Sequence, residues 1–405
     1  MKKKIELGTV IFIVVVAVIL ASIATYMYLT SLLPSLASKE NFYDRLSQVM
    51  NVVDQRYIGD TDDESAMNAL IKGYVTGIDK YSTYLDSESY AEYEAQLNGN
   101  YSGIGITVKY VSSTGLLKVI EVKSNSPASE ARIKKGDIIY KINGNLVTDL
   151  GYDDSVSMLK EEIGKTINIT VLRDEEYIDK TVTVSKYLTS SVDSDLLYDN
   201  VGYISVSEFD NTTADDFISS VEALEKKGAE KFIFDMRNNV GGSLSSVVSI
   251  LDYLLPEGDL VTLEGNEGKE KPLTSDAEFL DKEFVVLING STYSGGELFA
   301  AAVRDFKAGK IIGETTYGKG YAQEVIPLNG GRDGALYLST KLYYPPSGEN
   351  YEGVGVSPDI EVKLTPELED RFYELTTEED LQLCAALEQL GKTIENEDEK
   401  DSVSE

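Results

Sequence analysis

Histidine is absent from all 405 residues, so the candidate catalytic residues of this chain are a serine and a lysine. Without histidine, the Ser-His-Asp and Cys-His mechanisms and the commonest transition-metal sites are excluded. A serine nucleophile still needs a base, and the remaining candidate is a lysine held neutral. Ser294 lies at the turn from a strand-like run into a helical one, and Lys319 lies between Gly318 and Gly320. We predict that Ser294 and Lys319 form a nucleophile and its general base.

Gln323 follows Lys319 by four residues, a spacing that puts both side chains on one face of a regular strand. Its amide can orient an amine without favouring the charged form, as a carboxylate would. Lowering a lysine pKa from about 10.4 to about 7 requires roughly 4 to 5 kcal/mol, which burial must supply. We therefore expect apolar walls around Lys319, with Tyr293 and Phe299 as contributors.

A tetrahedral oxyanion beside Ser294 also needs hydrogen-bond donors. The backbone N–H of Gly295 is the first candidate, and Gly241 or Gly242 of the NNVGGS segment is the second. The same segment is explained equally well as a strand-to-helix turn with Ser243 as the helix cap. Both interpretations can hold together.

The elements that would position these residues alternate between strand and helix from Val201 to Val362. Strand-like runs (GYISVSEF, KFIFDM, EFVVLING) are followed by helical spacing at about Thr213 to Lys227, Ser243 to Leu255, and from Ser294. This alternation predicts a layered α/β core. Functional sites of open α/β folds gather at the carboxyl ends of strands, where the polar segments of this chain lie.

Short strand-like runs from Gly103 onward, with two helices among them, predict a separate small module in fewer than 90 residues. The segment Ser126 to Val147 resembles a PDZ domain, although Arg132 stands where that family commonly has glycine. The resemblance implies that a carboxylate-binding loop, which receives a peptide C-terminus, is formed by Gly103, Ile104, Gly105 and Ile106. Without that context, such glycines more often mark a bulge or a turn.

The N-terminal residues predict where the protein is located. Lys2 to Lys4 precede an uncharged apolar stretch from Leu7 to about Leu29, which is long enough to span a bilayer. A signal peptide cleaved after Ala37 is the alternative. Because positive charge stays on the cytoplasmic side, we expect a single-pass protein of the cell membrane with its N-terminus inside and its catalytic part extracytoplasmic.

Composition excludes several partners and cofactors. A formal charge of −32 argues against nucleic-acid binding, and no metal site or cofactor is expected. The single cysteine, Cys384, forms no intrachain disulfide and is predicted to be a core residue of a helix. Helical spacing from Asn41 to about Asn98 predicts a packing or dimerising segment, so a homodimer is a candidate assembly.

The ordered motifs resemble the carboxyl-terminal processing, or tail-specific, serine protease family. After the PDZ-like module come DxRNNxGG (Asp235 to Gly242), TxSxxE around Ser294 and GKGxxQ (Gly318 to Gln323). Similarity to that family implies that Ser294 is the nucleophile, Lys319 the general base and Gln323 the residue that positions the lysine. The sequence departs at Gly295-Gly296, where members commonly have alanine and serine.

The resemblance implies a multidomain α/β protein that cleaves extracytoplasmic proteins captured by their C-terminal tails through the PDZ domain, which precedes a Ser-Lys protease core. The expected parts are a cytoplasmic tip and transmembrane anchor (1–34), a helical segment (35–98), a PDZ domain (99–188), a protease core (189–365), a C-terminal helical segment (366–392) and an acidic disordered tail (393–405).

Three other functions are weighed against this one. Gly313 to Lys319 matches the GxxxxGK part of a P-loop, but Gly320 replaces the required Ser or Thr and no helix follows. An acyl-CoA enzyme on a similar fold lacks any binding signature for the cofactor. The main alternative is a catalytically inactive, membrane-tethered PDZ scaffold, against which the intact Ser294, Lys319 and Gln323 argue.

Overall fold

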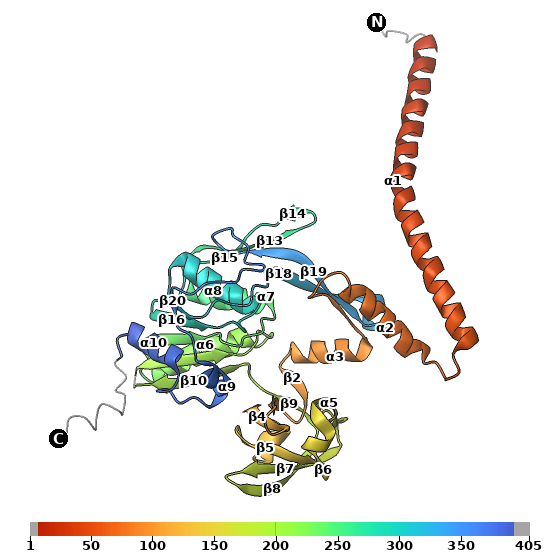
Figure 1. Ribbon diagram of the computed structural model, residues 1–405. Helices are drawn as coiled ribbons and strands as arrows, with labels where there is room; N and C mark the ends of the chain where they lie inside the picture. The colour runs from red at the N-terminus through yellow and green to blue at the C-terminus, as the bar shows by residue number, and fades with distance from the viewer. Residues whose placement is uncertain (1–6, 199, 393–405) are drawn as a thin grey trace, which may run out of the picture. The chain divides into compact units, whose positions relative to one another are not determined.

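The computed structural model describes residues 7–198 and 200–392, without the side chains of residues 7–15, 26 and 28–40 (Figure 1). The chain divides into two compact units, Met1–Ala69 and Leu70–Glu405. The basic residues Lys2 to Lys4 and the predicted acidic tail at 393–405 lie outside the described residues.

The first unit is helical. Helix α1 runs from Leu7 to Arg56, and α2 (Asp63–Thr76) leads into the second unit. No helix in the described part of the chain is long and apolar enough to cross a membrane. The structure therefore does not support the predicted anchor.

The PDZ module is a small antiparallel sheet covered by two helices. Its strands pair in the order β3-β4-β5-β7-β8, with β6 beside β5. A separate pair of strands, β2 and β9, closes the module at its entry and exit. The bounds are β2 (Asn100–Gly103), β3 (Ile106–Val111), β4 (Leu116–Val122), α4 (Pro127–Glu130), β5 (Ile138–Ile142), β6 (Asn145–Leu146), α5 (Val147–Leu159), β7 (Thr166–Arg173), β8 (Glu176–Thr183) and β9 (Ser185–Leu188).

Arg132, which stands where PDZ domains commonly have glycine, has a φ of 58°, a conformation that usually favours glycine. Its carbonyl accepts a hydrogen bond of 3.0 Å from Arg173, which also pairs with the buried Asp137. These contacts hold the arginine in its unfavourable backbone conformation.

The part of the chain that follows the PDZ-like module contains a six-stranded sheet in the order β10-β11-β12-β16-β17-β20, parallel except at the edge strand β10. Helices α6, α7 and α8 cover one face, and α10 covers the other (Figure 1). The bounds are β10 (Val192–Leu197), β11 (Val201–Val206), α6 (Thr213–Lys226), β12 (Lys231–Asp235), α7 (Leu244–Leu254), β16 (Glu283–Ile288), α8 (Gly295–Phe306), β17 (Lys310–Gly313), β20 (Ile360–Glu361) and α10 (Leu381–Gln389).

Alternation along β12 shows why both faces are covered. Phe232 and Phe234 pack against the three helices, whereas Ile233 packs against Leu383 and Leu387 of α10. Successive strand side chains point to opposite faces, so a strand buried on both sides is a continuous apolar run. Cys384 of α10 is only half-buried, which corrects its predicted place in the core, and its thiol donates to the Thr377 carbonyl at 3.2 Å.

A second, antiparallel sheet lies beside the first and includes β18 and β19, which pair along most of their length. Its remaining strands are β1, β13, β14 and β15. The bounds are β1 (Thr83–Leu85), β13 (Gly258–Gly265), β14 (Gly268–Lys269), β15 (Leu273–Ser275), β18 (Tyr321–Pro327) and β19 (Ala335–Tyr344); the short helices are α3 (Ser87–Gln96), η1 (Leu328–Gly331), α9 (Pro366–Asp370) and η2 (Phe372–Glu374).

Candidate active site

Ser294 lies at a tight turn between β16 and the first residue of α8. Its backbone has φ 54° and ψ −109°. This conformation is rare for residues other than glycine and costs about 1 to 3 kcal/mol. The Thr292 hydroxyl braces the turn by donating to the Met236 carbonyl at 2.8 Å. Ser294 is 8% exposed, so its hydroxyl sits at a nearly buried helix N-terminus.

Lys319 lies on the approach to β18 and is only 4% exposed. Its Nζ donates a hydrogen bond to Gln323 Oε1. Burial lowers the pKa of Lys319 to about 8. The predicted shielding by Tyr293 is confirmed, since its ring centroid is 4.6 Å from Nζ and that of Tyr81 is 5.1 Å away. Phe299 instead packs in the hydrophobic core.

Three carboxylates oppose the effect of burial on Lys319. Asp79, Glu297 and Glu352 each raise its pKa, although less than desolvation lowers it. The predicted effect of burial on Lys319 therefore prevails, although acidic groups oppose it. Asp79 is engaged elsewhere, since its Oδ1 accepts hydrogen bonds from the N–H groups of Tyr81 and Ser82 at 2.6 and 2.5 Å.

Gln323 links Lys319 to a distant part of the chain. While its Oε1 accepts from Lys319, its Nε2 donates to the Tyr81 carbonyl at 2.8 Å. The pairing of β18 with β19 shifts register between Ala322 and Gln323, so the strand is not regular where the prediction assumed it to be. The two side chains nonetheless meet, and the contribution of Tyr81 had no signal in the local sequence.

Glu297 joins the serine turn to the lysine segment. Its fully buried carboxylate accepts from the N–H groups of Ser294 at 2.8 Å, Gly318 at 2.6 Å and Lys319 at 2.8 Å, and from the Thr316 hydroxyl at 2.6 Å. Burial raises the pKa of Glu297, and these hydrogen bonds oppose the rise. One side chain thus holds both reactive residues by their backbones.

The structure separates the two candidates for the second oxyanion donor. The N–H of Gly241 donates to Asn239 Oδ1 at 2.8 Å and is already used. Within the described part of the chain, no acceptor is found for the N–H of Gly242 or Gly295. A Cβ on Gly241 would come within 2.8 Å of the Gly295 nitrogen, so the two segments touch. Gly242 and Gly295 are the donors that remain free.

The Gly295-Gly296 pair has a packing explanation. A Cβ on Gly296 would lie 2.8 Å from Asn239 Oδ1, and one on Gly295 would lie 3.1 Å from Val247 Cγ2. The missing side chain at 296 lets Asn239 approach and accept from Gly241. Two glycines in a row give the backbone at 295–296 extra freedom, and close contact with the 239–241 segment restricts it.

Ser294 has a buried tyrosine as a neighbour. Burial raises the pKa of Tyr343, and the Ser294 side chain opposes the rise. The hydrogen bonds found among the described residues include none between Ser294 Oγ and Lys319 Nζ. Hydrogen bonds of a catalytic pair are often long or absent before substrate binds.

A cleft of 380 Å³ runs along this site. It is bordered by Gly242 on one side and Gln323 on the other, with Leu244, Tyr337 and Tyr343 in its walls. Of the two candidate oxyanion donors that remain free, Gly242 lines this cleft.

The PDZ module has its own groove of 610 Å³, between β3 and α5. All four residues of the predicted carboxylate-binding loop, Gly103 to Ile106, line it. Gly105 has a φ of 78°, and a Cβ there would lie 2.1 Å from the Cβ of Ser126, so only glycine fits. The backbone of the loop is thus exposed to whatever the groove holds.

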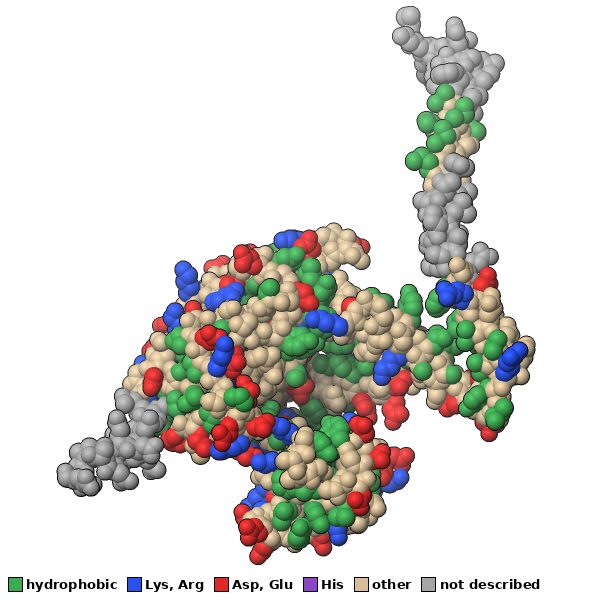
Figure 2. Space-filling model, viewed as in Figure 1, with side chains coloured by type: hydrophobic (Ala, Val, Ile, Leu, Met, Phe, Trp, Pro, Cys, Tyr) green, Lys and Arg blue, Asp and Glu red, His purple; other side chains and the backbone are tan. Residues whose placement is uncertain are grey.

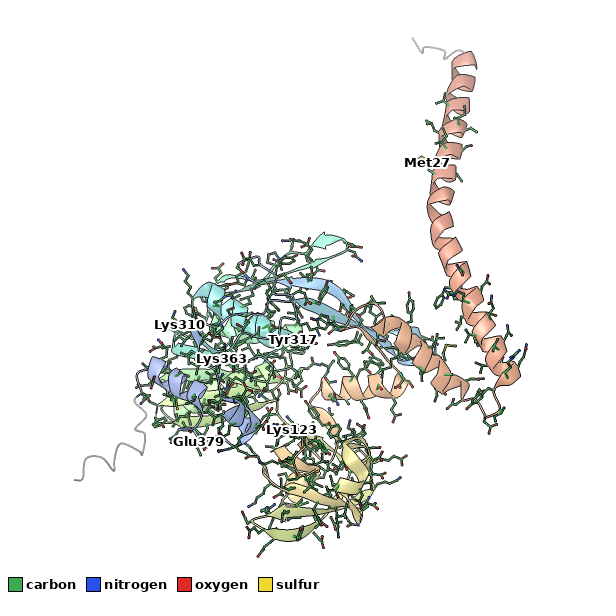
Figure 3. All side chains as sticks on the ribbon, viewed as in Figure 1. Met27, Lys123, Lys310, Tyr317, Lys363 and Glu379 are labelled. Carbon is green, nitrogen blue, oxygen red and sulfur yellow. The ribbon has the colours of Figure 1, made fainter. Side chains whose placement is uncertain are left out.

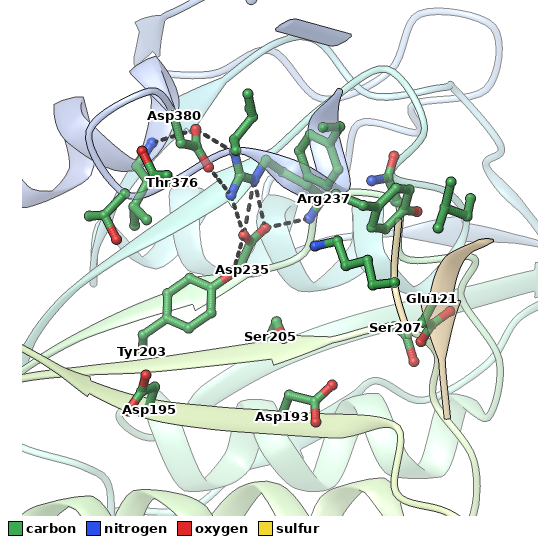
Figure 4. A pocket seen from close by; sticks show the side chains of 18 of the residues that line it. Glu121, Asp193, Asp195, Tyr203, Ser205, Ser207, Asp235, Arg237, Thr376 and Asp380 are labelled. Atoms are coloured by element: carbon green, nitrogen blue, oxygen red, sulfur yellow. Dashed lines mark hydrogen bonds and ion pairs between the residues drawn. The ribbon is translucent and has the colours of Figure 1, made fainter. Parts of the chain in front are cut away.

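A third cavity, of 540 Å³, lies between the PDZ module, the parallel sheet and the C-terminal segment (Figure 4). In its wall the buried Arg237 pairs with Asp235 at 2.6 Å and Asp380 at 2.8 Å, and Tyr203 donates to Asp235 at 2.7 Å. Arg237 begins the segment that ends at Gly242. Its ion pairs therefore fix one end of the loop that contains Gly241 and Gly242. Its role was not predicted from the DxRNN motif.

Comparison with known proteins gives matches for both halves. Residues 200–362 match the model of peptidase family S41, and residues 102–184 match that of the PDZ domain. The chain is 28% identical over 358 residues to the carboxy-terminal-processing protease of Bartonella bacilliformis, covering 84% of this chain and 80% of that protein. It is 27% identical over 373 residues to the carboxy-terminal processing protease CtpA of Bacillus subtilis, covering 90% and 78%. An S41 protease structure from Bacteroides fragilis shares the fold, with a TM-score of 0.60, 19% identity and coverage of 84% and 93%.

Proposed function

Because the chain belongs to the carboxyl-terminal processing serine proteases, with an S41 peptidase domain and a PDZ domain, we propose that Ser294, Lys319 and Gln323 perform its peptide-bond hydrolysis. The observation that carries the proposal is the buried Lys319, whose pKa is lowered to about 8 and whose Nζ is held by Gln323. A lysine with such a pKa is partly neutral at physiological pH and accepts a proton.

The reaction follows from this arrangement. Ser294 Oγ attacks the scissile carbonyl carbon while neutral Lys319 takes the hydroxyl proton, and the N–H groups of Gly295 and Gly242 stabilise the oxyanion. The C–N bond then breaks, and the Lys319 ammonium protonates the leaving amine. Water, deprotonated by Lys319, hydrolyses the resulting ester and regenerates Ser294. Attack requires the Ser294 hydroxyl to turn toward Lys319.

The pH dependence of cleavage tests the role of Lys319. Since only the neutral amine is a base, kcat/KM is expected to rise about tenfold per pH unit below pH 8 and to level off above it. The measurement is kcat/KM between pH 6 and 10 on a peptide without ionisable side chains, with circular dichroism as the control for folding. A flat profile through pH 8 would contradict Lys319 as the base.

We propose further that substrates are captured by their C-terminal tails. The groove beside Gly103 to Ile106 supports this, because backbone N–H groups in such a loop suit a terminal carboxylate and β3 offers an edge for an added peptide strand. Capture raises the local concentration of the tail at the cleft, which increases cleavage of substrates with a free C-terminus.

Amidation of the substrate C-terminus tests this capture. A protein substrate whose terminal carboxylate is converted to an amide is expected to be cut about tenfold more slowly at concentrations below KM, because the amide loses a charge-assisted interaction. The rate for a short peptide that reaches only the cleft should not change on amidation. Equal rates for both forms of the long substrate would remove the PDZ loop from recognition.

Location outside the cytoplasm, with residues 7–29 as the membrane anchor, remains our proposal from the sequence. The support is the uncharged apolar stretch after Lys2 to Lys4. Two measurements decide it: resistance of the full chain to alkaline extraction from membranes, and digestion of its catalytic part by protease added to intact cells. Recovery of the full chain in the soluble fraction would refute the anchor.

A further inference from the structure

Helix α3 lies between the PDZ groove and the catalytic cleft and contributes to both. Glu88, Glu92 and Gln96 line the PDZ groove, whereas Tyr93 and Leu97 line the cleft. The first three are spaced by four residues and form one stripe on the helix, and the other two form a second stripe. One helix, ten residues long, therefore separates the place where a tail is held from the place where it is cut.

Contacts at both ends of this segment fix α3 in place. Toward the catalytic half, the ring centroids of Tyr93 and Tyr337 lie 5.7 Å apart, and the Asn211 N–H donates to the Leu97 carbonyl at 2.8 Å. Toward the PDZ module, α3 continues into β2, where Tyr101 stacks on Tyr187 with centroids 5.9 Å apart. Asp86 caps the helix by accepting from the Ser89 N–H at 2.8 Å. The helix is thus a stable wall rather than a loose linker.

The stripe that faces the PDZ groove is acidic and available. Glu88, Glu92 and Gln96 are exposed, and Figure 2 shows acidic side chains gathered on this side of α3. No ion pair of Glu88 or Glu92 is found among the described residues.

The other acidic residues lining the groove are already engaged. Glu161 and Glu162 each pair with Lys165 at 3.5 Å. Lys123, at the end of β4 (Figure 3), pairs with Glu121 at 2.7 Å. Of the four glutamates that line the groove, Glu88 and Glu92 on α3 are therefore the two without an ion pair among the described residues.

We propose that Glu88 and Glu92 make α3 a specificity surface that favours substrate tails with basic residues upstream of an apolar C-terminal residue. The proposal rests on the tail capture described above and names the class of tail captured. The apolar terminal residue fits beside Ile104, Ile106 and Leu159 of the groove. Upstream residues of the tail then pass along α3, where lysine or arginine meets the two carboxylates and glutamate or aspartate is repelled.

The expected size follows from exposed ion pairs. One such contact between exposed side chains changes a binding constant by up to about fivefold, so two carboxylates give a preference on the order of tenfold. Salt screens the attraction between exposed charges. The preference for lysine is therefore expected to shrink at ~1 M salt, where the screening length is only about 3 Å.

Binding to the full chain carrying Ser294→Ala tests the proposal without cleavage. Fluorescent peptides would share one apolar C-terminal residue with a free carboxylate and carry either lysine or glutamate at each upstream position in turn. We expect about tenfold tighter binding of the lysine series, reversal of that order by Glu88→Lys with Glu92→Lys, and its loss in Glu88→Gln with Glu92→Gln. Glu94→Lys is the matched control, because Glu94 lies on the same helix but lines neither cavity.

Two results would overturn the proposal: equal affinity for the lysine and glutamate series, or an unchanged order in the Glu88→Lys, Glu92→Lys variant. Circular dichroism shows whether that variant folds, and the neutral Gln variant gives the same answer without reversed charge. The outcome is separate from that of the proposed mechanism. Loss of all cleavage by the wild-type chain, with the lysine preference in binding intact, would refute the Ser-Lys site alone.

Discussion

The Ser294→Ala variant is expected to lose peptide cleavage, with kcat lower by at least about 10⁴-fold, while its affinity for tails is unchanged. Removing the hydroxyl removes the nucleophile that attacks the scissile carbonyl carbon and forms the ester. The fold should survive, since the turn is held through the Ser294 N–H and carbonyl rather than through the hydroxyl. The measurement is kcat on a peptide and on an unstructured protein, with cut sites mapped by mass spectrometry.

Ser291→Ala is the matched control for this variant. Ser291 lies in the same turn, three residues before Ser294, and is exposed to solvent. Its hydroxyl takes no part in the proposed reaction, so the variant should keep its activity. Full activity in Ser294→Ala would refute the nucleophile, whereas equal loss in both variants would point to damage to the turn.

The Lys319→Arg variant is expected to lose activity by about 10³-fold or more, although the charge and much of the bulk are retained. An arginine side chain is not deprotonated in proteins, so it cannot accept the serine proton. Lys319→Met is expected to be equally inactive but at least as stable as the wild type, because burial of the Lys319 amine is unfavourable to its charged form. The measurements are kcat/KM and the midpoint of urea unfolding for each variant.

Lys310→Arg provides the control for a lysine-to-arginine change. Lys310 is exposed, pairs with Asp359 at 3.6 Å and lies on the far side of the core from α3 (Figure 3). The Lys310→Arg variant should have the activity of the wild type. Activity of Lys319→Arg within a few-fold of this control would exclude proton transfer by Lys319.

Local patterns were sufficient for the elements that carry the site. The helices predicted at about Thr213 to Lys227 and Ser243 to Leu255 are confirmed as α6 and α7, and Ser294 does immediately precede α8. Each follows from side-chain periodicity and turn residues within one segment, where the spacing along the chain is the spacing in space. The absence of histidine leaves Lys319 as the candidate base.

Contacts between distant segments were not predictable in this way. Tyr81, which orients Gln323, is 242 residues away from it in the chain. The donor role of Gly241 was excluded only because Asn239 folds back onto its N–H, and the acidic surroundings of Lys319 depend on Asp79 and Glu352 from two separate loops. Such neighbours are set by packing of the sheets.

The sequence by itself thus determined the candidate pair and its order along the chain, because the absence of histidine leaves lysine as the base and the ordered motifs single out Ser294 and Lys319 among many serines and lysines. Tertiary structure alone decided whether Lys319 could act as a base. Desolvation by the surrounding rings lowers its pKa and three nearby carboxylates raise it, and only their distances in space decide which effect is larger. Tertiary structure alone likewise decided the proposed role of α3, because its two stripes line two separate cavities.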